Sequence, residues 1–257
     1  GVEWNWYTKN NENVLYWHWS ADKAWVKNLK IAGWNEALIV YILGASSPTF
    51  PIEKAVYDTG WAKNGALKNG KTFYNYTLPL GSDYGGPLFF SHYSFLGIDP
   101  RNLSDKYADY WVQNRNHALI NYGYCVENPK RYPGYSEYCW GLTASDGNTG
   151  YSAFSPSNDK GVIAPTAAIS SMPYTPVESM RALKFFYYKL GDKIWGEYGF
   201  TDAFNLSANW FDNQYLAIDQ GPIAVMIENY RSALLWNLLM SDPDVKSGLN
   251  KLGFQYL

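Results

Sequence analysis

Two carboxylates in this sequence stand where helices are expected to begin. Asp219 lies just before a Gly-Pro pair, and Glu36 follows Asn35. Cleavage of a glycosidic bond needs one carboxylic acid to protonate the leaving oxygen and one carboxylate to activate water or attack directly. Because a helix N-terminus favours the ionised form, such a position suits a base, whereas an acid must be kept protonated by burial or a nearby carboxylate. We take Glu36 and Asp219 as the candidate catalytic pair; the alternative is that each is only a first-turn acid favoured by the helix dipole.

Aromatic and polar residues in the connections could form a sugar-binding cleft around this pair. Aromatic residues make up 18% of the chain, with 12 Trp, 23 Tyr and 12 Phe, and rings with polar neighbours can stack on the apolar faces of sugars. Asp202 could bind sugar hydroxyls, orient a catalytic group or cap a turn, and His92 fits a buried core position as well as a cleft. The residues predicted to contact substrate are Trp34, Asn35, His92, Trp140, Asp146, Tyr198, Asp202 and Trp210.

Charge and hydropathy argue against several partners. The formal net charge is -2 and no long block of like charges occurs, so neither nucleic acid nor an anionic membrane is expected to bind. No apolar stretch is long enough for membrane insertion, and no export signal opens the chain. We therefore expect a neutral partner such as an oligosaccharide or polysaccharide.

Motifs for metals and common cofactors are missing from the sequence. There are three histidines but no HExxH or CxxC pattern, and neither GxSxG nor a glycine-rich nucleotide loop is present. The segment Asp146-Gly147-Asn148 resembles the start of a calcium loop, yet it lacks the next spaced oxygen ligand and the distal Glu. We expect no metal and no cofactor. Cys125 and Cys139 fit either a loop-closing disulfide or two buried free thiols.

Hydrophobic periodicity predicts an all-α fold in a single domain over residues 1–257. The opening residues 1–20 alternate aromatic and polar residues, which predicts an extended or hairpin segment. The long connections 63–86, 128–161 and 198–219 are expected to form the site. A first helix is expected from about Trp34, with Asn35 as its N-cap and an end at 44–48. Further helices are predicted at 52–58, 87–95, 106–126, 164–171, 176–190, 222–240 and 243–252.

Two of these helices carry strong start signals. Thr175-Pro176 followed by Glu178 has the pattern of a capping box with proline at the first helical position. Asp242-Pro243 with Asp244 repeats the pattern before the last helix.

Five longer motifs together resemble the glycoamylase-like family of bacterial (α/α)6-barrel proteins, which includes endo-β-1,2-glucanases. The motifs are GWNEALIVYILGASSP (33–48), YCWGLTASDG (138–147), APTAAISSMPYTP (164–176), YGFTDAFN (198–205) and YLAIDQGPIAVMIENYRSALLW (215–236). The resemblance extends from about Trp4 to Phe254. It implies an inverting hydrolase of β-1,2-glucan that releases short sophoro-oligosaccharides, with Glu36 and Asp219 as active-site acids in a central cleft. It also implies a periplasmic or extracellular location.

The chain departs from the family pattern at its front. Family members carry an additional N-terminal helical region that contributes further acidic residues to the cleft, and this chain shows no counterpart. We therefore expect a barrel that lacks its N-terminal helices, with the missing part of the domain as a partner. Two alternatives follow: a non-catalytic glycan-binding protein on the same fold, and hydrolysis or transfer of α-glucan.

Overall fold

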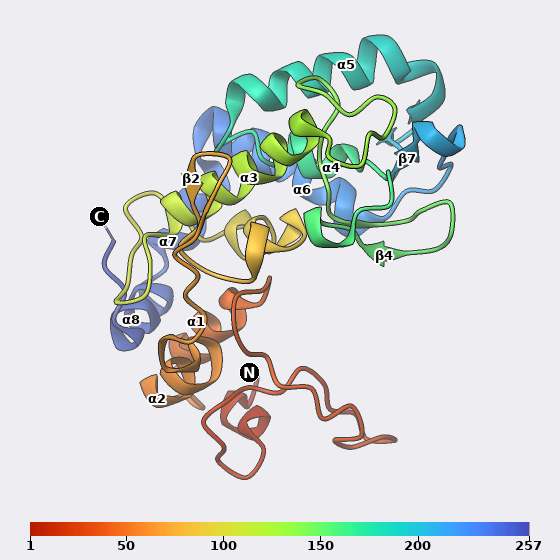
Figure 1. Ribbon diagram of the computed structural model, residues 1–257. Coiled ribbons are helices and arrows are strands. Elements are labelled where there is room, and N and C mark those ends of the chain that lie inside the picture. Colours follow the sequence, from red (N-terminus) through yellow and green to blue (C-terminus); the bar gives the residue numbers. More distant parts are fainter. Residues whose placement is uncertain (257) are drawn as a thin grey trace.

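The computed structural model describes residues 1–256, which are mostly helical (Figure 1). The α-helices are α1 (Leu38–Ser46), α2 (Lys54–Val56), α3 (Tyr110–Glu127), α4 (Pro165–Ile169), α5 (Pro176–Ile194), α6 (Ala217–Ser232), α7 (Leu234–Ser241) and α8 (Pro243–Leu252). Four antiparallel hairpins of two-residue strands add to the predicted all-α fold. They are β1–β2 (Thr72–Phe73, Tyr76–Thr77), β3–β4 (Ala144–Ser145, Ser152–Ala153), β5–β6 (Trp195–Gly196, Gly199–Phe200) and β7–β8 (Phe204–Asn205, Trp210–Phe211).

Several predicted helices differ from the structure. The last helix, 243–252, is confirmed as α8, and the helix predicted at 176–190 continues to Ile194. By contrast, the segment 87–95 forms two 3-10 turns, Leu88–Ser91 and Ser94–Leu96. The helix predicted at 52–58 is limited to α2, which runs into a π turn at Tyr57–Trp61.

The long helix predicted at 222–240 is two helices, because the chain turns at Ala233 with φ of 56°. Asn229 holds this turn: its Oδ1 accepts from the N–H groups of Leu235 and Trp236 at 3.1 and 3.3 Å, and its Nδ2 donates to Leu96 O at 2.9 Å. The buried side chain of Asn229, which belongs to α6, thus caps the start of α7. It also connects these two helices to the 3-10 turn that ends at Leu96.

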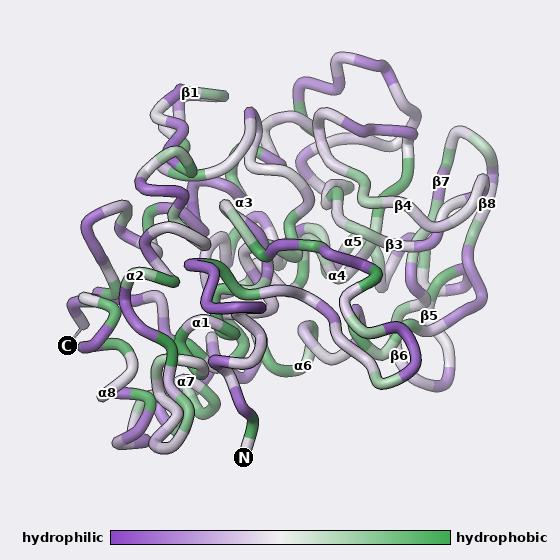
Figure 2. Tube along the Cα trace, turned by 90° about the horizontal axis from the view of Figure 1, so that it is seen from below, coloured by the Kyte–Doolittle hydropathy of each residue, from purple (hydrophilic) through white to green (hydrophobic). Residues whose placement is uncertain are grey.

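Two large hydrophobic cores organise the molecule. The first unites α1, the π turn and α8, and so combines residues from both ends of the chain. The second lies among α3, α4, α5 and α6 and draws on residues 88–236. Figure 2 shows hydrophobic stretches around α1 and α4 and hydrophilic stretches along the outer loops. A small third cluster, Phe154, Val162, Ala164 and Ala203, packs beneath the hairpins.

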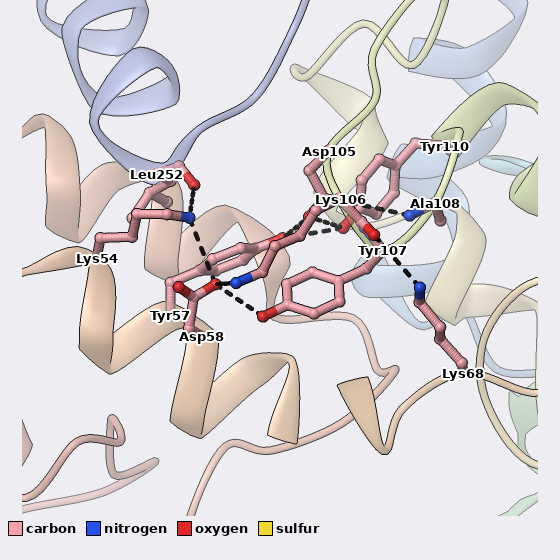
Figure 3. A network of polar contacts seen from close by, with 10 residues as sticks. All are labelled: Lys54, Tyr57, Asp58, Lys68, Asp105, Lys106, Tyr107, Ala108, Tyr110 and Leu252. Carbon is pink, nitrogen blue, oxygen red and sulfur yellow. Dashed lines mark hydrogen bonds and ion pairs between the residues drawn. The ribbon is translucent and has the colours of Figure 1, made fainter. Parts of the chain in front are cut away.

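A polar network connects the first core to the C-terminal end of α8 (Figure 3). Lys54 donates to the carbonyl of Leu252 at 2.5 Å. The hydroxyl of Tyr57 donates to Asp105, and the hydroxyl of Tyr107 donates to Asp58 at 2.8 Å. Segments far apart in the sequence are therefore held side by side.

The predicted helix starts have different outcomes. Asp242 caps α8 as predicted, since its Oδ1 accepts from the N–H groups of Asp244 and Val245. Pro176 is at the first position of α5, but Thr175 makes no side-chain cap bond; its hydroxyl donates to Ser171 O instead. The capping box expected there is therefore wrong.

The structure also describes the two cysteines and the opening segment, for which the sequence allows local predictions. Cys125 and Cys139 are both buried free thiols. The opening segment forms a 3-10 helix at Trp4–Thr8 and makes an isolated bridge between Tyr16 and Lys30, so the extended or hairpin segment predicted for 1–20 is wrong in its first part. Among the described residues, no helix has both the length and the apolar character needed to cross a membrane.

Candidate active site

Asp219 lies in the first turn of α6, as predicted, although this helix starts at Ala217 rather than at Pro222. Its side chain is buried. The hydroxyl of Tyr93 donates to Asp219 Oδ1 at 3.1 Å, and Thr166 donates to the Asp219 carbonyl at 2.7 Å. No N–H or O–H group of residues 1–256 donates to Asp219 Oδ2. This oxygen is therefore available to a proton or to a bound molecule.

A second buried carboxyl, that of Asp202, contacts Asp219. Asp202 Oδ2 accepts from the N–H of Asp146 at 2.7 Å. Burial raises the pKa of Asp202 to about 8; the Asp146 N–H opposes this rise and the charge of Asp219 adds to it. Burial likewise raises the pKa of Asp219, while the neighbouring carboxyl of Asp202 and the hydroxyl of Tyr93 oppose this rise. Two carboxyl groups in contact cannot both ionise easily, which is the arrangement that acid–base sites use.

Tyr151 shows that Glu36 belongs to the same region. Partial burial raises the pKa of its phenol, and the negative charges of four carboxylates raise it further. In order of effect these are Asp219, Asp202, Asp146 and Glu36. Because such effects weaken with distance in a screened medium, the predicted pair lies in the same region of the molecule as Asp202 and Asp146.

Glu36 precedes its helix instead of lying in the first turn. Asn35 Oδ1 accepts from the N–H of Ala37 at 2.8 Å, so the chain makes a turn here and α1 begins only at Leu38. The prediction that Asn35 is the N-cap is therefore wrong by two residues. The carbonyl of Glu36 is fixed by the hydroxyl of Ser94.

Glu36 lines a hollow of ≈ 500 Å³ beside the opening segment. Aromatic rings of Trp4, Tyr16 and Trp17 contribute to its wall. These rings come from the aromatic stretch at the front of the sequence, where no substrate contact was predicted.

Three predicted substrate contacts are buried away from the site. Trp34 packs against Trp61 and Phe95 in the first core, and Trp140 is fully buried with its indole N–H donating to Glu178 O. His92 is also buried, and its Nε2 bonds Ser171 Oγ at 3.0 Å. The structure therefore places the side chains of Trp34, His92 and Trp140 in the interior, away from any surface on which a sugar could stack.

The other predicted contacts lie on the hairpins. Tyr198 is 69% exposed and packs edge-on against Tyr215. Trp210, in β8, is half-buried against the small third cluster. Asp146 follows β3 and brings its carboxyl beside that of Asp212.

Sequence reasoning missed Tyr93, Tyr151 and Asp212. Tyr93 and Tyr151 are ordinary members of an aromatic-rich sequence and carry no distinguishing neighbour. Asp212 had a usable signal, because an acid directly after an aromatic pair in a predicted site-forming loop resembles Asp202 in its own loop.

Comparisons with known proteins agree on one family. Residues 28–243 match the Glycoamylase family, described as "Putative glucoamylase". A curated relative from Parabacteroides distasonis, an exo β-1,2-glucooligosaccharide sophorohydrolase that acts at the non-reducing end, is 47% identical over 98% of this chain. This chain covers 38% of that relative.

Two solved structures are similar over nearly the whole chain. An endo-β-1,2-glucanase from Chitinophaga pinensis, in complex with sophorotriose and glucose, is 56% identical with a TM-score of 0.96 over 99% of this chain. A glucoamylase-like protein from Bacteroides uniformis is 60% identical, with the same TM-score over 98% of this chain. The chain spans 62% of each of these two structures, so it corresponds to a part of their domain.

Proposed function

The chain belongs to the Glycoamylase family, and from this premise we propose that it hydrolyses glucans joined by β-1,2 bonds. The observation that carries the proposal is the pair of buried carboxyl groups of Asp219 and Asp202, which lie in contact, with Tyr93 bonded to Asp219. The charge of Glu36 reaches the same region, since it acts on Tyr151 together with Asp219. The relatives named for β-1,2-glucan chemistry support the choice of substrate. A buried acid group without aromatic neighbours would not suggest a sugar, but here exposed rings such as Tyr151 and Tyr198 lie on the adjacent hairpins.

Glu36 and Asp219 form the acid and base pair in this proposal. The reaction inverts the anomeric centre: one carboxyl protonates the leaving oxygen while the other activates a water on the opposite face of the sugar. Such a pair needs a separation of about 6.5–9.5 Å in the substrate complex. The position of Asp219 is fixed by the first turn of α6, by the bond from Tyr93 to its side chain and by the bond from Thr166 to its carbonyl.

Endo cleavage that releases sophoro-oligosaccharides is the main form of the proposal. A second form, release of sophorose from chain ends, is favoured by the 47% identity to the Parabacteroides distasonis sophorohydrolase. Both place the helices in an (α/α)6 barrel, a ring of six helical hairpins around the cleft. The eight α-helices of residues 1–256 are fewer than such a ring contains, so the proposal includes further helices that complete it.

The test is incubation with linear β-1,2-glucan beside starch, following reducing ends, product anomer and product length. We expect activity on the β-1,2 polymer alone, with inversion and a range of early product lengths; sophorose as the sole early product would favour the exo form. Glu36→Gln and Asp219→Asn, checked for folding by circular dichroism, should each abolish release. Binding of the glucan without release of reducing ends would overturn the hydrolase in favour of a glycan-binding protein.

Location is part of the same proposal. A β-1,2-glucan hydrolase of this family would meet its polymer in the periplasm or outside the cell, and fractionation of the source cells tests this.

A further inference from the structure

Three aspartates at the ends of the short strands form a second acidic cluster next to Asp219. One carboxylate oxygen from each of Asp146, Asp202 and Asp212 lies within 4.8 Å of the other two. Asp146 follows β3, Asp202 lies between β6 and β7, and Asp212 follows β8. The cluster therefore joins three loops that are far apart in the sequence.

The backbone fixes two of these residues relative to each other. The N–H of Asp212 donates to Ala203 O at 3.0 Å, and the N–H of Asp202 donates to Gln214 O at 3.0 Å. Asp202 also receives the N–H of Asp146 on Oδ2. The three carboxyl groups are thus held together by the fold, although their charges repel one another.

Each of the two buried members has an oxygen that no donor satisfies. Asp212 is 7% exposed and Asp202 1%. Asp212 Oδ1 accepts from the N–H groups of Asn213 and Gln214, whereas Asp212 Oδ2 receives no hydrogen bond from the described residues. The carboxyl of Asp212 lies beside that of Asp146. Asp202 Oδ1 likewise receives none. Leaving a buried carboxylate oxygen unpaired is costly, so these oxygens point to a ligand that carries positive charge.

No side chain of residues 1–256 supplies that charge. None of the lysine, arginine or histidine side chains described lies within ion-pair distance of the three carboxylates. From these oxygens we propose that Asp146, Asp202 and Asp212 bind a divalent cation, and that the cation is Ca²⁺.

Calcium fits the donor set and its spacing. Carboxylate oxygens are its preferred ligands, at about 2.3–2.6 Å, so two ligands on opposite sides of the ion lie no more than about 4.6–5.2 Å apart. The three oxygens lie within 4.8 Å of one another, a separation that one such ion can span. Mg²⁺ is usually held by one or two carboxylates and keeps several waters, whereas this cluster offers three carboxylates. Asp146 is partly exposed, and so its side gives the ion access and room for water ligands.

The sequence pattern explains why this site is not visible in one motif. Asp146-Gly147-Asn148 offers the beginning of a calcium loop but not its later ligands. In the structure the missing oxygens come from Asp202 and Asp212, so the ligands are assembled by the hairpins instead of by one loop. The proposal therefore departs from the expectation of no metal, which rests on the absence of zinc motifs and of a complete calcium loop in the sequence.

The test is calcium titration of the EDTA-treated protein by calorimetry, with MgCl₂ titrated in parallel, together with thermal melts. We expect saturable binding of Ca²⁺ at a single site, a higher Tm in Ca²⁺, and a weaker response to Mg²⁺. Asp212→Asn and Asp146→Asn should each weaken Ca²⁺ binding at least about tenfold, because affinity depends on the number of charged ligands. Asp22→Asn, an exposed acid outside the cluster, is the matched control and should bind like wild type.

Two results would overturn the proposal. One is the absence of saturable Ca²⁺ binding in wild type. In that case, a higher Tm for EDTA-treated Asp212→Asn than for EDTA-treated wild type would show that the carboxyl groups repel one another without an ion and share protons instead. The other is equal affinity in wild type and both cluster variants. Since binding is measured without glucan, failure of this proposal is distinct from failure of the proposed hydrolase.

Discussion

Tyr93 and Asp219, 126 residues apart in the sequence, meet through a hydrogen bond of 3.1 Å from the phenol to Asp219 Oδ1. The donor comes from the segment between two 3-10 turns and the acceptor from the first turn of α6. Because α6 alone leaves the carboxyl free to rotate, the phenol selects one orientation for it.

Tyr93→Phe should therefore lower kcat/KM on linear β-1,2-glucan by about 10- to 100-fold. A hydrogen bond to a charged group contributes about 1.5–3 kcal/mol, and each 1.36 kcal/mol corresponds to about a factor of ten in rate. The measurement is steady-state kinetics, with kcat and KM separated. Tyr188→Phe, on the exposed side of α5, should retain wild-type values; a Tyr93→Phe enzyme as active as this control would show that the phenol does not position Asp219.

Two buried histidines should make the fold sensitive to acid. Burial lowers the pKa of His92 to about 3, helped by His117, and burial lowers the pKa of His117 to about 4. The ring of His117 contacts Gly86 O through Nε2 at 3.0 Å, which opposes the fall in its pKa, and Ser91 Oγ through Nδ1 at 2.8 Å. Since both residues titrate near 6.5 when unfolded, the unfolded chain binds more protons below that pH.

The contribution of these two histidines to the free energy of unfolding should therefore be constant above pH 6.5. It should fall as the pH drops from 6.5 toward 4. Each histidine contributes a slope of up to about 1.4 kcal/mol per pH unit. Urea unfolding at pH 7, 6 and 5 measures the slope, and His92→Gln should make it shallower by about one such contribution. His18→Gln, in the partly exposed opening segment, is measured as the control. An unchanged slope in His92→Gln would contradict the prediction.

Gly248 is required by the close contact between α1 and α8. A Cβ at this position would lie 2.7 Å from Ser46 N and 2.9 Å from Ile42 O, both backbone atoms that cannot move aside. Gly248→Ala should lower the free energy of unfolding by about 1–3 kcal/mol, despite the better helix propensity of alanine.

Gly191, in α5, provides the opposite case within the same chain. The nearest atom to its Cβ position is Trp195 Cβ at 4.0 Å, so Gly191→Ala should stabilise the protein by about 0.5–1 kcal/mol. Denaturant titration of the two variants measures both effects. If both substitutions shifted stability in the same direction, packing between α1 and α8 would not be the cause.

Asn229→Ala should destabilise the protein by at least about 2 kcal/mol. It removes the acceptor for two N–H groups of α7 and the donor to Leu96 O, and it leaves these backbone groups without partners near the second core. Thermal melting compares it with Asn237→Ala, an exposed position in α7, which should change stability by less than about 0.5 kcal/mol. If Asn229→Ala had the same Tm as Asn237→Ala, the side chain of Asn229 would not be needed to hold the turn at Ala233.

Helix content was predictable from the sequence where a local signal was strong. Asp242-Pro243 fixed the start of α8, and Asp219 was correctly placed in a first helical turn. The prediction was wrong where tertiary contacts override propensity. Asn229 ends α6 and starts α7 through bonds to distant backbone, and no local pattern announces this.

The site was predictable only in part, for a related reason. Asp202 was named as a candidate, but its contact with Asp219 and the approach of Asp146 and Asp212 depend on how three hairpins pack. Aromatic residues gave the weakest guide. Burial of Trp34 and Trp140 shows that ring content near a candidate acid does not distinguish core packing from sugar contact, because both use the same side chains.

The polar network at the end of α8 has a consequence for how the chain folds during synthesis. Lys54 bonds Leu252 O, and the first core needs α8 against α1. That core can therefore close only after α8 has been synthesised, whereas the second core, from residues 88–236, can form earlier. Trp4 and Tyr7 of the opening segment pack against this core, so their rings cannot reach their final environment before α8 is made.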